Sequence, residues 1–119
     1  MAQINLTDPL FLIPAATGPV FFLAGWIMYS FPPKKINMLY GYRSRNSMKD
    51  QKHWDFAQLY SARKMMIGGG VLTLTCLLSL FVKVDEMTGM FLGLGLMILM
   101  IIIVLFSTEK AMKEKFGRD

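Results

Sequence analysis

Residues 37–64, NMLYGYRSRNSMKDQKHWDFAQLYSARK, contain the side chains of this sequence that are suited to binding an anion. Arg43 carries a planar fork of N–H donors, which matches a phosphate group or the free carbonyl groups at a helix end. Gly41 permits a turn with positive φ and lets another part of the chain approach closely. These residue types indicate a ligand or lipid-headgroup site, for which the candidate residues are Asn37, Gly41, Tyr42, Arg43, Ser44, Ser47, Trp54 and Arg63.

Catalytic and metal chemistry find little support in the residue types. His53 is the only histidine, which disfavours a metal site. Cys76 is the only cysteine and lies in an apolar run, so we expect a buried, inert thiol and no disulfide within the chain. No nucleophile, base and orienting group occur together in the sequence. We therefore expect no catalytic residues, no metal, no cofactor and no enzyme activity.

Three apolar stretches are long enough to cross a membrane, at residues 10–31, 65–82 and 89–106. Apolar residues make up 54% of the 119 residues, more than a soluble protein of this size buries. Eighteen helical residues rise roughly 27 Å, close to the thickness of the hydrocarbon layer. We predict an all-α integral membrane protein, a single domain over residues 1–119. It has three transmembrane helices and a folded cytoplasmic loop and helix between the first and second.

The positions of the basic residues predict the orientation of these spans. The first loop, residues 32–64, holds eight of the thirteen Lys and Arg residues, and the segment after residue 106 holds four. The second loop has Lys83 alone, and the segment before the first span has none. Because cytoplasmic loops are enriched in Lys and Arg, we predict an outside N-terminus and a cytoplasmic C-terminus. Basic residues held against a bilayer suit anionic lipids as partners and disfavour nucleic acid.

The first loop is predicted to be folded. Residues 32–46 are rich in turn-forming Pro, Gly and Asn. Ser47 is the predicted N-cap of a helix, with Asp50 three residues on in a capping-box arrangement. Residues 48–64 contain no Pro or Gly, so we expect this helix to run on into the second span.

Small residues predict where the helices pack closely, since they let helix backbones approach each other in lipid. We expect such contacts along the stripe of Trp54, Ala57 and Ser61, at Gly89 and Gly93, and at the GGG run of residues 68–70. The other side of the first helical segment carries Phe56 and Leu59 among basic residues. That side is suited to the lipid headgroup zone, where long basic side chains reach the water.

Residues 37–64 as a whole resemble the signature of the Sdp immunity (SdpI-like) family of bacterial membrane proteins. The matching positions are Asn37, Gly41, Tyr42, Arg43, Ser47, Met48, Trp54, Ala57 and Arg63 or Lys64. Ser44 and Gln58 stand where the family usually has Thr and Asn, and both keep the ability to form hydrogen bonds. The resemblance covers nearly the whole chain and implies a multi-pass protein of the bacterial inner membrane. It also implies resistance to a sporulation-delaying killing factor.

Immunity to a membrane-active peptide toxin is therefore the leading functional hypothesis. The alternatives are a lipid- or isoprenoid-headgroup-binding membrane protein, and a small structural subunit of a larger membrane complex that docks through the third helix. Membrane lipids are the expected partners, and a peptide toxin, a larger membrane complex or a second copy of the chain remain open. The loop is either an anion site or a structural unit in which Arg43 caps a helix and Trp54 packs at the membrane interface.

Overall fold

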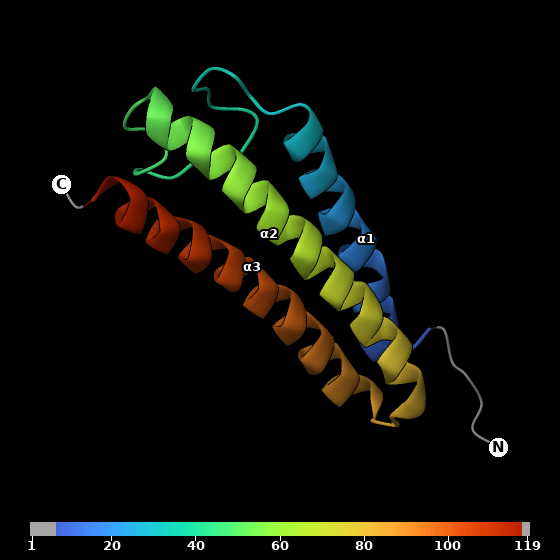
Figure 1. Ribbon diagram of the computed structural model, residues 1–119. Helices are drawn as coiled ribbons and strands as arrows, with labels where there is room; N and C mark the ends of the chain where they lie inside the picture. The colour runs from blue at the N-terminus through green and yellow to red at the C-terminus, as the bar shows by residue number, and fades with distance from the viewer. Residues whose placement is uncertain (1–6, 118–119) are drawn as a thin grey trace.

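Three long helices dominate the computed structural model, which describes residues 7–117. The elements are α1 (Pro9–Ser30), α2 (Gln51–Leu78), the short 3-10 helix η1 (Ser79–Phe81) and α3 (Glu86–Phe116). All three long helices have the length and composition to cross a membrane, which confirms the predicted all-α class and its three spans. In Figure 1, the loop of residues 31–50 and the end of α3 lie at one end of the bundle, here called the loop end. The start of α1 and the α2–α3 turn lie at the opposite end, the turn end.

Helix α2 runs without a break from the polar loop into the second apolar stretch, as predicted. Its first residue differs from the prediction, because the N-cap is Asp50 and not Ser47. The Asp50 carboxylate accepts a hydrogen bond from the backbone N–H of His53 at 2.9 Å. Ser47 instead lies in a turn in which the backbone N–H of Met48 donates to the carbonyl oxygen of Ser44 at 3.1 Å. The helix therefore begins three residues later than the sequence pattern predicts.

Helices α1 and α2 cross with almost no space between their backbones. A Cβ atom placed on Gly69 would lie 2.5 Å from the backbone oxygen of Gly18 and 2.9 Å from the Cα of Phe22. A Cβ atom on Gly25 would lie 2.7 Å from the backbone oxygen of Ala62. In lipid, such close backbone contact replaces the hydrophobic drive that holds soluble helices together. The predicted crossing point in the GGG run is confirmed.

Helix α3 also packs through glycines. A Cβ atom on Gly89 would lie 3.3 Å from Leu10, and one on Gly93 would lie 3.0 Å from Ile13, both on α1. A Cβ atom on Gly68 would lie 2.6 Å from the sulfur of Met100 on α3. Gly89 and Gly93 are therefore occupied by contacts within the chain, which removes much of the surface that a structural-subunit role would use for docking.

Few apolar side chains are buried between the helices. Leu72, Met100 and Val104 form one buried cluster, with Phe21 and Met65 packed against it. Most large apolar side chains instead point outward, such as those of Leu74, Leu77, Ile98 and Phe106, which are more than half exposed. An outer apolar surface of this extent is suited to the lipid phase.

The α1–α2 crossing leads to a prediction with an internal control. Gly69→Ala should destabilise the protein by about 1–3 kcal/mol, since the added methyl group must push α1 away from α2. Gly70→Ala places its methyl group in open space, with nothing within 4 Å. It should be neutral or slightly stabilising, because Ala favours the helix. Unfolding of both purified variants in detergent, titrated with SDS, measures the difference. Equal stabilities would contradict this packing.

Candidate functional site

The loop is tied to α3 through the carboxylate of Glu109. Its Oε2 atom accepts hydrogen bonds from the Tyr42 hydroxyl at 2.6 Å and the Ser44 hydroxyl at 2.8 Å. Its Oε1 atom accepts one from the side-chain amide of Asn46 at 2.7 Å. Hydrogen bonds to an ionised carboxylate are about twice as strong as those between neutral groups. Three donors from one short loop segment therefore hold that segment on the end of the third helix.

The same loop segment is tied to α2 through Gln58, whose side chain is fully buried. Its Nε2 donates to the backbone oxygen of Tyr42, and its Oε1 accepts from the backbone N–H of Tyr42, each at 2.7 Å. The amide thus pairs with both backbone groups of one residue, an arrangement called the Gln58 clamp below. Gly41 precedes this pair with φ at 106°, which confirms the predicted turn with positive φ. A Cβ atom there would overlap the Gln58 side-chain oxygen and lie 2.6 Å from the Cγ of Pro33.

Trp54 and Ser47, two of the candidate site residues, are completely buried. The indole N–H of Trp54 donates to the backbone oxygen of Pro33 at 2.7 Å. Trp54 is therefore packed inside the protein and does not anchor in lipid, and its place on a buried stripe with Ala57 and Ser61 is confirmed. The Ser47 hydroxyl accepts from the backbone N–H of Ser44 at 2.7 Å, so it closes a turn instead of capping a helix. Both side chains hold the loop in shape.

The remaining candidates do not join this cluster. Arg43 is exposed, and its Nη1 donates to the backbone oxygen of Met38 inside the loop. The interpretation that Arg43 caps a helix is therefore wrong. The Asn37 side-chain oxygen accepts from the backbone N–H groups of two later loop residues, which makes it a turn former. Arg63 lies on α2 with its guanidinium 5.6 Å from the ring of Tyr29 on α1.

We define the loop junction as Gly41, Tyr42, Ser44, Asn46, Ser47, Gln58 and Glu109. It joins all of its polar side chains to one another or to backbone groups of the loop. Burial, together with the hydrogen bond and negative charge of Glu109, raises the pKa of Tyr42 well above its usual range. Tyr42 is therefore a protonated donor to an ionised acceptor. The hydrogen bonds of the junction thus hold the loop in place, and Arg43, Asn37 and Arg63 are candidate residues that lie outside it.

The raised Tyr42 pKa gives a pH prediction. Since the folded pKa lies above the unfolded value of about 10, the stabilisation is complete below pH 10 and is lost as the pH rises through the folded pKa. The phenolate absorbance of wild type minus that of Tyr42→Phe should therefore show no ionisation near pH 10 while the protein is folded. A difference curve with its midpoint near pH 10 would contradict the Tyr42–Glu109 hydrogen bond.

Sequence reasoning missed three members of the junction, Asn46, Gln58 as a clamp, and Glu109. The available signal was the position of Glu109, an acid directly after the third apolar stretch in a segment otherwise rich in Lys. Nothing in the local pattern pairs it with residues about 65 positions earlier in the chain.

The side of α2 that was predicted to meet headgroups is partly covered by the end of α3. Phe56 meets Phe116 edge to face, with ring centroids 5.8 Å apart, and Lys115 lies 4.9 Å from the Phe56 centroid. The ring centroids of His53 and Phe116 lie 4.2 Å apart, with the two rings tilted by 30°. The Nδ1 atom of His53 lies 2.8 Å from the Asp50 carboxylate. These contacts leave the side chain of Leu59 exposed, as expected for a residue near lipid.

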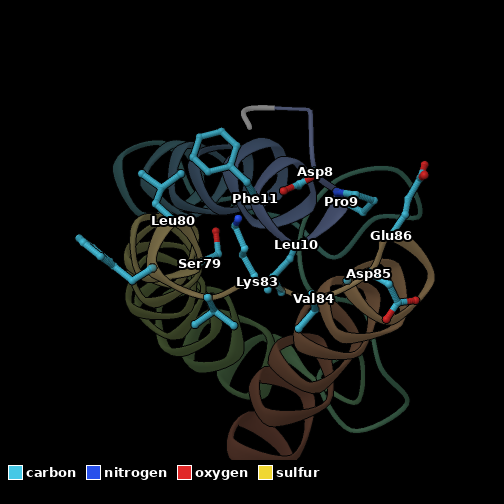
Figure 2. Close-up of a pocket in the computed structure, with 13 residues that line it drawn as sticks. Asp8, Pro9, Leu10, Phe11, Ser79, Leu80, Lys83, Val84, Asp85 and Glu86 are labelled. Atoms are coloured by element: carbon cyan, nitrogen blue, oxygen red, sulfur yellow. The ribbon is translucent and has the colours of Figure 1, made fainter. Parts of the chain in front are cut away.

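A hollow of about 690 Å³ opens at the turn end, between the start of α1 and the α2–α3 turn. Figure 2 shows it lined by apolar residues such as Leu10 and by the charged residues Asp8, Lys83, Asp85 and Glu86. The Asp85 carboxylate caps α3 by accepting from the backbone N–H of Thr88 at 3.3 Å. The turn end, where this hollow opens, is at the opposite end of the bundle from the loop junction (Figure 1).

The sequence of the chain matches a known protein family and a known protein. The chain is 39% identical over 103 residues to the uncharacterized protein YfhL of Bacillus subtilis (strain 168), covering 81% of this chain and 82% of that protein. No solved structure matches the chain. The SdpI/YfhL protein family matches residues 34–108, a segment that includes the whole loop junction except Glu109. The chain belongs to the SdpI/YfhL protein family.

Proposed function

We propose that this protein protects a bacterial cell against a membrane-active peptide toxin. The observation that carries the proposal is membership of the SdpI/YfhL family over residues 34–108, in which the signature segment builds the loop junction. In this proposal the protein lies in the inner membrane with its N-terminus outside. Among residues 7–117, eleven of the twelve Lys and Arg residues lie in the loop, the first half of α2 or the end of α3, and this loop end then faces the cytoplasm.

The proposed protection involves no bond cleavage. The polar groups of the loop junction are hydrogen-bonded to each other, so the junction offers no free nucleophile or base. The turn end then faces outward. A toxin that arrives from outside first meets the hollow at this end, which is lined by Asp8, Lys83 and Glu86. At the opposite end, the loop junction ties the loop to α2 and α3.

The immunity proposal is tested by survival of a toxin-sensitive bacterium that expresses the protein. Wild type should protect, whereas Arg43→Lys should lose most of the protection, since lysine keeps the charge but lacks the fork of donors. A general attraction of basic residues to lipid, worth about 1 kcal/mol per residue, would be unchanged by this substitution. Lys35→Arg, in the same loop, is the control, and all variants are compared at equal amounts in the membrane.

One result would overturn the immunity proposal, and another would limit the role of the loop. If wild type gives no protection against any peptide toxin of this class, the immunity function is wrong. If Arg43→Lys protects fully, the loop contributes only charge and structure.

A further inference from the structure

An apolar cavity of about 360 Å³ lies between the helices in the half of the bundle next to the loop end. Its walls come from Phe21 and Met28 of α1, Met65 of α2, and Ile101 and Leu105 of α3. Gly41, Tyr42 and Arg43 border it at the loop.

The cavity follows from how α1 and α3 are held. Toward the turn end they touch directly, where Gly93 packs on Ile13 of α1. Toward the loop end, the Tyr42 side chain reaches α3, where its hydroxyl hydrogen-bonds Glu109. Gly41, Tyr42 and Arg43 of the loop therefore border the gap that is left between the three helices at this end.

Hydrocarbon is the material suited to this gap. The side chains that line it from the helices are all apolar, and three of them are flexible methionines, Met28, Met65 and Met100, which adapt to an irregular occupant. A gap left empty at this depth would forfeit the dispersion contacts of its walls. An acyl chain of the surrounding bilayer is the nearest material that restores them.

Arg43 supplies the charge at the rim of the cavity. Its exposed guanidinium has five N–H donors, of which the structure commits Nη1 to the backbone oxygen of Met38. Among residues 7–117, no acidic side chain forms an ion pair with it. The carboxylate of Glu109 is engaged by three donors of other loop residues. An uncompensated guanidinium is complementary to a phosphate, which it binds through paired hydrogen bonds.

We propose that this cavity binds one acyl chain of an anionic phospholipid, with the headgroup phosphate held by Arg43. The proposal goes beyond immunity and does not depend on it. It requires only the three-helix arrangement, and it places the lipid in the leaflet on the loop side. Free phosphate and zwitterionic lipid are the competing occupants, and the test separates them.

The test uses the full chain in detergent with a phosphatidylglycerol analogue that carries a photo-reactive group on its acyl chain. Labelling should be saturable and should map by mass spectrometry to cavity residues such as Met65 and Met100. Unlabelled phosphatidylglycerol should compete at least about tenfold better than phosphatidylcholine, because the choline cation of phosphatidylcholine offsets the charge of its phosphate and is repelled by the guanidinium of Arg43. Inorganic phosphate should not compete.

Two variants and one control locate the site. Arg43→Gln should weaken phosphatidylglycerol binding about tenfold, whereas Lys35→Gln, which removes the same charge elsewhere in the loop, should leave it unchanged. Because Arg43→Gln also removes a loop hydrogen bond, Ile101→Trp provides an independent test. It fills the cavity from α3 and should abolish the cavity label while the protein stays folded.

Three outcomes would overturn the proposal. One is equal competition by phosphatidylcholine, which would mean ordinary boundary lipid. Another is competition by inorganic phosphate as strong as that by the lipid, which would mean an anion site without a chain. The third is unchanged labelling in Ile101→Trp. Each can occur while the protein still confers immunity, so failure here is distinct from failure of the proposed function.

Discussion

Glu109→Ala should destabilise the protein by about 3–4 kcal/mol and release the loop from α3. The variant removes one acceptor group that three donors share, those of Tyr42, Ser44 and Asn46. Each hydrogen bond to a charged group contributes about 1.5–3 kcal/mol, and partial exposure of the site reduces the sum. The half-buried donors are also left to find water in a confined space.

Trp54 provides a local measurement of this effect, because its buried indole binds Pro33 in the same loop. The chain has two tryptophans, so Trp26→Phe leaves Trp54 as the only tryptophan, which is excited selectively at wavelengths that tyrosine does not absorb. In that background Glu109→Ala should shift the Trp54 emission to longer wavelength before the helices unfold. Far-UV circular dichroism then reports loss of the helices separately.

Glu114→Ala is the matched control for Glu109→Ala. It removes the same charge from an exposed position on the same helix, and it should change stability by less than about 0.5 kcal/mol. Glu109→Gln should fall between the two, since an amide keeps one acceptor but brings a donor toward the donors already there. Unchanged Trp54 emission in Glu109→Ala would show that the loop is held without this carboxylate.

The helices and their contacts were largely predictable because the signals are local. The apolar stretches set the three spans, and the absence of Pro and Gly in residues 48–64 predicted one continuous α2. Small residues predicted the close approaches at Gly69, Gly89 and Gly93, because only a missing side chain allows backbones so near.

The error at the start of α2 shows where local rules are overridden. Ser47 and Asp50 are both good capping residues, three positions apart, and the sequence alone favoured the first. In the fold Ser47 is completely buried, whereas Asp50 is exposed. A hydroxyl is easily buried with backbone partners, but an ionised carboxylate is not, so the turn takes the serine and the helix takes the aspartate.

The loop junction was not predictable for a different reason. Tyr42 lies in the loop and bonds to Gln58 on α2 and to Glu109 on α3. These partners are 16 and 67 residues away in the sequence. Residue types alone indicated an anion site whose eight candidate residues included Tyr42, Ser44 and Arg43. The fold separates them, since the first two bind Glu109 and Arg43 binds the Met38 backbone. The anion-site prediction therefore now depends on Arg43 and stays a prediction.

Gly41→Ala should produce the other large effect, a loss of about 3–5 kcal/mol. A φ of 106° is strained for any residue with a Cβ atom, at about 1–3 kcal/mol. The new methyl group would also overlap the Gln58 side-chain oxygen and lie 2.6 Å from Pro33. Displacing Gln58 leaves the part-buried N–H group of Tyr42 without a partner, at about 1–3 kcal/mol, and leaves the Ser47 hydroxyl as the donor to the Tyr42 carbonyl oxygen.

Gly95→Ala is the control for this substitution, because Gly95 is helical and a Cβ atom there would meet nothing within 4 Å. It should be neutral or slightly stabilising. SDS-induced unfolding of both purified variants, followed by circular dichroism, gives the comparison. Equal stability of Gly41→Ala and Gly95→Ala would contradict the positive φ and the clamp together.

A double-mutant cycle separates backbone strain from loss of the clamp. Gln58→Leu removes the clamp alone, so adding Gly41→Ala to it should cost only the strain. The two losses should therefore sum to more than the loss of the double variant, by about 1–3 kcal/mol, as expected for groups in direct contact. Strict additivity of the two losses would mean that the methyl group added by Gly41→Ala never reaches Gln58. The loop would then depend on glycine for its backbone conformation alone.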